Sequence, residues 1–146
     1  MRHGIGTMKW VNTSSYTGEW QLNQANGKGR FVYPHGDIYE GNLVNNKASG
    51  FGVYTSLKGL RYEGHWKEDQ NHGQGIETWF DGSKYEGTYI MGKKEGKGKY
   101  TYPSGAVFYG DWHDNNIHGY GVNVYEKGDI YRGQWERNCL QGHGIY

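Results

Sequence analysis

A Gly-x-Gly pair recurs along this chain with a strict period of 23 residues. The leading glycines are Gly4, Gly27, Gly50, Gly73, Gly96, Gly119 and Gly142, and the second glycines are Gly6, Gly29, Gly52, Gly75, Gly98, Gly121 and Gly144. A fixed period of this length is typical of tandem repeats, in which each copy is one supersecondary unit that packs on the next. The chain is therefore predicted to be a repeat array.

Two further columns of residues keep the same period. An aromatic residue is followed two positions later by glycine and four positions later by a large apolar residue. The first column is Tyr16, Tyr39, Tyr62, Tyr85, Phe108 and Tyr131, and the second is Trp20, Leu43, Trp66, Tyr89, Trp112 and Trp135. This alternation indicates β-strands that carry ring, glycine and ring on one face and polar residues on the face toward water.

Turn residues separate the strands. Gly36, Gly59, Gly82, Gly105 and Gly128 share one column, and Pro34 and Pro103 precede it by two residues. Proline before a left-handed glycine predicts a three-residue hairpin loop with a G1 bulge. The other loop carries Asn23, Asn46, Asp69, Gly92, Asn115 and Asn138, residue types that tolerate the left-handed conformation.

These turns predict the strand register of the second copy. Gly27 would face Leu43, Gly29 would face Gly41, and Phe31 would face Tyr39. A glycine opposite a ring leaves bare backbone on which the ring can lie. A structural role is therefore predicted for ten glycines: Gly27, Gly29, Gly50, Gly52, Gly73, Gly75, Gly96, Gly98, Gly119 and Gly121.

The predicted fold class is all-β, because no segment shows the 3.6-residue period of a helix. We expect a single-layer, twisted and curved antiparallel meander of tandem 23-residue hairpins, about 6 repeats with open ends, over residues 1–146. A half repeat would span 1–15, repeats would start near 16, 39, 62, 85 and 108, and a partial repeat would span 131–146.

The repeat unit resembles the MORN family (Membrane Occupation and Recognition Nexus). The resemblance is carried by YEGHW at 62–66, HGQG at 72–75 and DGSKYEG at 81–87. Thr13 in the turn-glycine column, Leu43 in the aromatic column and Ser56 in a ring column depart from the pattern. The resemblance implies a scaffold, as in radial spoke head proteins, junctophilins and protozoan cytoskeletal proteins, and hence a cytoplasmic, cytoskeletal and in particular ciliary or axonemal location.

Catalytic chemistry is not expected from this chain. The family includes a SET-domain methyltransferase and plant phosphatidylinositol phosphate kinases, but neither catalytic domain accompanies the repeats in this sequence. His72 and His118 are two repeats apart, about 20 Å at roughly 4.8 Å per strand, which is too far for one zinc ion. We therefore expect a non-enzyme with no cofactor and no metal.

Charge also limits the partners. The chain has 16 Lys plus Arg against 15 Asp plus Glu, so no general field attracts nucleic acid. A local group of four lysines, Lys93, Lys94, Lys97 and Lys99, is a candidate patch for an anionic partner, with a solvated surface as the alternative reading.

Two function hypotheses follow. In the preferred one, a partner peptide or helix lies in an aromatic groove formed by Tyr16, Trp20, Tyr39, Tyr62, Trp66, Tyr85, Tyr89, Phe108, Trp112, Tyr131 and Trp135. The alternative for these rings is that they pack on one another. Open strand edges would also allow strand addition by a partner or by a second copy. The second hypothesis is binding of phosphoinositide or a membrane surface, which the near-zero net charge disfavours.

Overall fold

Antiparallel strands make up the secondary structure of the computed structural model, which describes residues 4–136 and 139–145. The chain divides into two compact units, Met1–Asn71 and His72–Tyr146. Among the described residues there is no helix long and apolar enough to cross a membrane.

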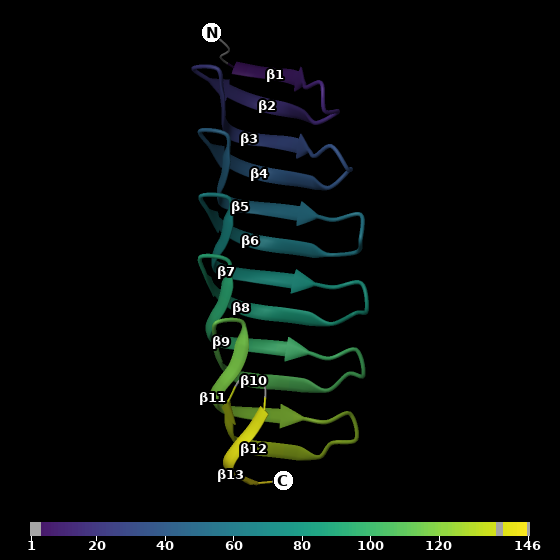
Figure 1. Cartoon of the computed structure of the whole chain (residues 1–146), viewed down its shortest axis with the longest axis vertical. Helices are drawn as coiled ribbons and strands as arrows, with labels where there is room; N and C mark the ends of the chain where they lie inside the picture. Colours follow the sequence, from purple (N-terminus) through teal and green to yellow (C-terminus); the bar gives the residue numbers. More distant parts are fainter. Residues whose placement is uncertain (1–3, 137–138, 146) are drawn as a thin grey trace. The chain divides into compact units, whose positions relative to one another are not determined.

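Within each unit the strands are neighbours in chain order (Figure 1). The first unit holds β1 (Gly4–Lys9), β2 (Ser15–Gln21), β3 (Gln24–Val32), β4 (Ile38–Val44), β5 (Lys47–Thr55) and β6 (Arg61–Lys67). The boundary falls inside β7 (Gln70–Thr78), and the second unit continues with β8 (Lys84–Ile90), β9 (Lys93–Thr101), β10 (Val107–His113), β11 (Asn116–Val124), β12 (Ile130–Glu136) and β13 (Cys139–Ile145). The predicted antiparallel hairpin meander is confirmed.

The predicted strand register and three-residue loop are also confirmed. Gly27 pairs with Leu43, Gly29 with Gly41 and Phe31 with Tyr39. In the loop that follows, the amide of Gly36 donates to the carbonyl of Tyr33 at 2.9 Å, and Gly36 has a φ of 101°. Two residues that depart from the repeat pattern keep the structural role of their column. Thr13 takes the left-handed turn position with a φ of 72°, and Leu43 is buried like the aromatic residues of its column.

Two-residue turns join one hairpin to the next. Both turn residues have positive φ, as at Asn45 (51°) and Asn46 (69°), which is the type I′ geometry favoured between twisted strands. The predicted left-handed conformation is found at Asn23, Asn46, Asp69, Gly92 and Asn115. Asn138 lies outside the described residues.

The Asn46 side chain also ties neighbouring hairpins together, a role that the sequence analysis did not predict. Its Oδ1 accepts the amide of Ala25 at 2.7 Å, while its own amide donates to the carbonyl of Ala25 at 3.0 Å. Asp69 makes the same pair of bonds to Ala48, at 2.6 and 3.0 Å. Each turn therefore holds the beginning of an earlier strand.

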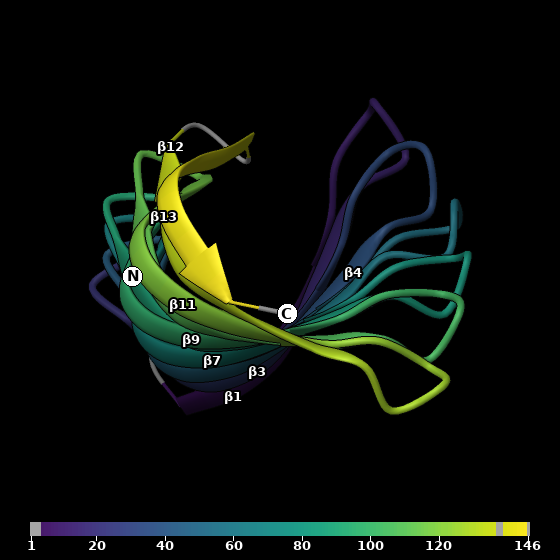
Figure 2. The same cartoon turned by 90° about the horizontal axis from the view of Figure 1, so that it is seen from below.

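A bulge in the strand that follows each ring-bearing strand explains why tyrosine recurs in the ring column. The register of β2 against β3 shifts between Gly18 and Trp20, where the three residues 26–28 of β3 lie opposite Glu19 alone, so the extra residues belong to β3. The hydroxyl of Tyr16 donates to the carbonyl of Glu19 at 2.9 Å, and Tyr39, Tyr62 and Tyr85 make the same bond three residues ahead. Figure 2 shows that β3 of the first unit is bent, as expected of a strand with such a bulge.

The two glycines of a Gly-x-Gly pair differ in their surroundings, as β7 illustrates. Gly73 has a φ of 92°, in the region that favours glycine, and it faces Tyr89 of the next strand. Gly75 is buried and faces Gly87, so two residues without a Cβ lie opposite each other there. Backbone conformation therefore favours glycine at Gly73, whereas close packing favours it at Gly75.

Glycines in the column of Gly75 make room for the rings. A Cβ at Gly29 would overlap the ring of Tyr16, and one at Gly98 would lie 2.6 Å from Cε2 of Tyr85. Gly6 occupies the same column, but a Cβ there would meet Trp20 at an ordinary 3.5 Å. The ring on bare backbone is thus a contact between two strands joined by a two-residue turn, and Gly6 of β1 is free of it.

Gly29→Ala is expected to lower the free energy of unfolding by about 2 kcal/mol, because the added methyl group must displace a packed ring. Gly6→Ala is the matched control and is expected to change it by less than about 0.5 kcal/mol. Urea denaturation monitored by tryptophan fluorescence measures both, and equal costs would contradict this account of the glycine column.

Substitutions at Asn46 separate its two roles. Asn46→Gly keeps the left-handed turn and loses the side-chain acceptor, for an expected cost of about 1 kcal/mol. Asn46→Ala also places a Cβ in the left-handed region, which adds about 1 kcal/mol more. Denaturation curves that showed alanine to be no worse than glycine would rule out the backbone contribution.

Candidate partner-binding face

In each unit the predicted groove residues lie on one face of the strands, here called the ring face. Most of them are buried beneath its surface: Tyr16, Tyr85 and Phe108 are 0% exposed, and Tyr39, Tyr62, Tyr89, Trp20, Trp112, Tyr131 and Trp135 are at most 8% exposed. Trp66 is half-buried. A fully covered ring offers no surface to a partner, so these side chains are the floor of the face and not its contact surface.

The floor rings cover one another edge-on. The rings of Tyr16 and Trp20 are 5.1 Å apart at 88°, and Trp66 meets Tyr39 and Tyr62 in the same way at 5.3 and 5.0 Å. The indole Nε1 of Trp66 donates to the carbonyl of Gly52 at 3.1 Å. That of Trp20 donates likewise to the carbonyl of Gly6 at 3.1 Å, whereas the buried Nε1 of Trp135 has no hydrogen-bond partner among the described residues. The close packing makes the floor a preformed surface.

The contact surface of the ring face consists of other rings. In the first unit a half-exposed series, here called the ring strip, contains Met8, Trp10, Phe31, Tyr33, Tyr54 and Trp66. Ring centroids lie 5.6 Å apart between Trp10 and Phe31, 4.8 Å between Phe31 and Tyr33, and 6.0 Å between Tyr33 and Tyr54. Of these residues the sequence analysis placed only Trp66 in the groove and missed the others, which recur two and four positions after the second glycine of each pair.

One end of the ring strip is hollowed. Met8, Trp10 and Phe31 surround a hollow of about 390 Å³ above the floor rings Tyr16 and Trp20. The side chains of Asn23 and Asn46 also line it and add polar groups to the apolar walls. An apolar hollow with a few amide groups is typical of peptide recognition.

A carboxylate holds Tyr54 in its place in the strip. Asp37 accepts bonds from the hydroxyl of Tyr54 at 2.5 Å and from the amide of Leu57 at 3.0 Å, and His35 Nε2 lies 2.8 Å away. The bond from Tyr54 is the main cause that lowers the pKa of Asp37 to about 2. Burial, together with this bond, raises the pKa of Tyr54. The two residues are therefore locked as phenol and carboxylate at neutral pH.

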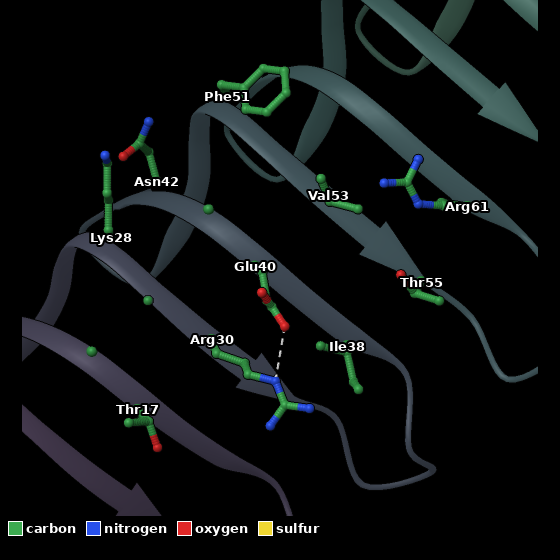
Figure 3. A pocket seen from close by; sticks show the side chains of 13 residues that line it. Thr17, Lys28, Arg30, Ile38, Glu40, Asn42, Phe51, Val53, Thr55 and Arg61 are labelled. Carbon is green, nitrogen blue, oxygen red and sulfur yellow. Dashed lines mark hydrogen bonds and ion pairs between the residues drawn. The ribbon is translucent and has the colours of Figure 1, made fainter.

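The opposite, polar face of the first unit carries a wider hollow of about 700 Å³ (Figure 3). Arg30 and Glu40 point toward each other across it, and Arg30 Nε donates to Glu40 Oε1 at 3.0 Å. Arg61, also on its rim, pairs with Glu63 at 2.8 Å. These charges largely neutralise each other. In the described parts of the chain, no three His, Cys, Asp or Glu side chains are grouped so as to hold a metal ion.

The family follows from a comparison with known repeats. The model of a family described as MORN repeat matches residues 1–15, 16–38, 39–61, 62–84, 85–107, 108–130 and 131–146. The chain belongs to the MORN-repeat family. No curated protein matches its sequence.

Two solved structures show a similar fold to this MORN array. The SAS-4 (dCPAP) TCP domain of Drosophila melanogaster, in complex with a proline-rich motif of Ana2 (dSTIL), has a TM-score of 0.58 at 15% identity, covering 90% of this chain and 73% of that chain. The TCP10c domain of Drosophila melanogaster Sas-4 has a TM-score of 0.50 at 14% identity, covering 98% of this chain and 93% of that chain. At such identities the likeness concerns the fold alone.

The lysine patch predicted for an anionic partner is not one surface in the MORN array. Lys93 pairs with Asp114 at 2.7 Å, Lys97 with Asp111 at 2.6 Å and Lys99 with Glu86 at 3.9 Å. Lys94 lies on the ring face, because alternate residues of β9 point to opposite sides. The prediction of a joint patch is therefore corrected: each of the four lysines has a carboxylate neighbour, Lys94 having Glu77 at 3.9 Å, and Lys94 lies on a different face from the other three.

The Asp37 cluster makes the stability of the first unit pH-dependent. An unfolded Asp has a pKa near 3.8, and the folded value is about 2, so the contribution of ionised Asp37 is complete above pH 4 and is lost between pH 4 and 2. As the pH falls from 4 to 2, the melting temperature of the wild type should therefore approach that of Asp37→Asn. Tyr54→Phe, which removes the bond but keeps the carboxylate, should narrow the interval, and parallel curves for all three proteins would contradict the assignment.

Proposed function

We propose that this MORN protein is a non-enzymatic scaffold that binds an extended, proline-rich segment of a protein partner along the ring strip. The observation that carries the proposal is the continuous series of half-exposed rings from Trp10 to Tyr54 over a packed floor. Polyproline II segments dock on aromatic-lined grooves, because pyrrolidine rings fit between flat side chains and the ligand is already extended. A preformed strip loses little conformational entropy on binding.

The comparison with SAS-4 supports this choice of ligand. A TCP domain of similar fold was solved with a proline-rich motif. Because a shared fold does not establish a shared function, the argument for this chain rests on its own rings. The strip presents Trp, Tyr and Phe, which provide most of the binding energy at many protein interfaces.

A cytoskeletal setting is part of the proposal, with a ciliary axoneme as its first choice. It is supported by membership of the MORN family and by the resemblance to radial spoke and protozoan cytoskeletal proteins. Binding of phospholipid gains no support from the lysines, since Lys93, Lys97 and Lys99 each have a carboxylate neighbour. The protein ligand is therefore preferred to the lipid ligand.

Decaproline, added to the ¹⁵N-labelled full chain, should shift the indole N–H resonances of Trp10 and Trp66, which lie on the strip. A Gly-Ser peptide of the same length should leave them unchanged. Phe31→Leu should weaken the binding about tenfold, since it removes a central ring and keeps an apolar side chain.

Phe51→Leu is the matched control, because Phe51 is 47% exposed on the polar face. It should bind decaproline like the wild type. Absence of any indole response to decaproline at millimolar concentration would refute the proposed function, and equal loss in both variants would place the ligand elsewhere.

A further inference from the structure

Three columns of the repeat change together at one place in the second unit. Glu77 stands where Met8, Phe31 and Tyr54 occur in other copies, and Lys94 stands where Ala25, Ala48 and Ile117 occur. Tyr89 replaces the usual tryptophan, and its hydroxyl donates to Oε1 of Glu77 at 2.5 Å. A base, an acid and a phenol thus meet on a face that is mostly apolar and aromatic, where Asn71 and Asn123 occupy the Lys94 and Glu77 columns in other copies.

Lys94 is held among rings. Its Nζ lies 5.0 Å from the ring centroid of Trp79, 5.4 Å from that of Tyr85 and 6.0 Å from that of Tyr89, within the range of cation–π attraction. Its side chain is only 15% exposed. The rings therefore fix the ammonium at the floor of the ring face, with a small opening toward the outside.

The ammonium of Lys94 lacks a hydrogen-bond acceptor within the described part of the chain. The closest carboxylate oxygen, Oε1 of Glu77, is 3.9 Å away, beyond hydrogen-bonding range, and already accepts the bond from Tyr89. Burial lowers the pKa of Lys94, and the charge of Glu77 opposes this only in part. Three N–H donors with so little exposure lose hydration without gaining a protein acceptor, so an acceptor from outside is favoured.

We infer that Lys94 is a specificity-determining residue whose ammonium donates to a backbone carbonyl of a proline-rich segment lying on the ring face of the second unit. The inference rests on the proposed function. Proline residues in such a segment have no N–H, and the carbonyls of a polyproline II helix carry no internal hydrogen bonds. Trp79 and Tyr100, whose ring centroids are 5.9 Å apart, are half-buried beside the site and supply the apolar contact.

Lys94→Met tests this assignment, because it keeps the length of the stem and removes the donors. A merely structural lysine would make the variant less stable. If the ammonium instead serves to bind a ligand, the variant should not be less stable. Replacing a buried ammonium that lacks a protein acceptor by an apolar side chain leaves the stability unchanged or raises it. The melting temperature of Lys94→Met is therefore expected to equal or exceed that of the wild type.

The binding experiment uses decaproline and the ¹⁵N-labelled full chain, with the indole N–H of Trp79 as the local reporter and that of Trp10 as the reporter of the first unit. In Lys94→Met the affinity read at Trp79 should fall about tenfold, while that read at Trp10 stays unchanged. Lys93→Met, which removes a lysine paired with Asp114 on the other face, should match the wild type at both reporters.

The outcomes distinguish the two proposals. A response of Trp10 without any response of Trp79 in the wild type overturns the inference about Lys94 and leaves the proposed function standing. Equal affinities for decaproline, read at Trp79 in the wild type and in Lys94→Met, also overturn the inference about Lys94 and leave the proposed function standing. If neither indole responds, the proposed function fails and this inference fails with it.

Discussion

The contact of a flat ring with bare glycine backbone is the constraint on which the rest of this structure depends. Tyr16 lies on Gly29 of the next strand, and the same contact recurs between Tyr39 and Gly52 and between Tyr85 and Gly98. Strands in a single layer have no second sheet to cover their side chains, so the rings must lie flat and cover themselves. A ring can do so only where a neighbouring residue has no Cβ, which is why glycine and tyrosine recur with one common period.

The same contact also solves a hydrogen-bonding problem. The bulge in each Gly-x-Gly strand interrupts the ladder opposite one residue of the ring-bearing strand, and the tyrosine hydroxyl donates to the carbonyl of that residue. Phe108 stands in the tyrosine column, lacks the hydroxyl and is equally buried, so the ring can pack in the same way without this hydrogen bond. The ring, the glycine and the bulge together build the packed floor. Because the floor is already covered, a second row of rings can lie on it and stay partly exposed.

This division between floor and strip explains how a thin sheet can both fold and bind. Floor rings are covered, whereas strip rings such as Phe31 and Tyr33 stay half-exposed. Apolar contact along a strip has little directional preference. Polar groups placed in it, such as the Asp37 cluster and Lys94, supply the positioning and the hydrogen-bond donors that apolar rings lack.

The sequence by itself determined the repeat, the register of the predicted hairpin, the three-residue loop and the left-handed position in the other loop, because these follow from local spacing and from the backbone preferences of Gly, Pro and Asn. It did not determine how deeply each side chain is buried. Tyr16 and Phe31 share a face, and only the stacking of neighbouring hairpins decided that Tyr16 is covered while Phe31 is partly open. Likewise, adjacency in sequence suggested one lysine patch, but strand alternation and the positions of Asp114, Asp111 and Glu77 separated Lys94 from Lys93 and Lys97. Burial and ion pairing depend on residues that are distant in sequence, so the tertiary structure alone decided them.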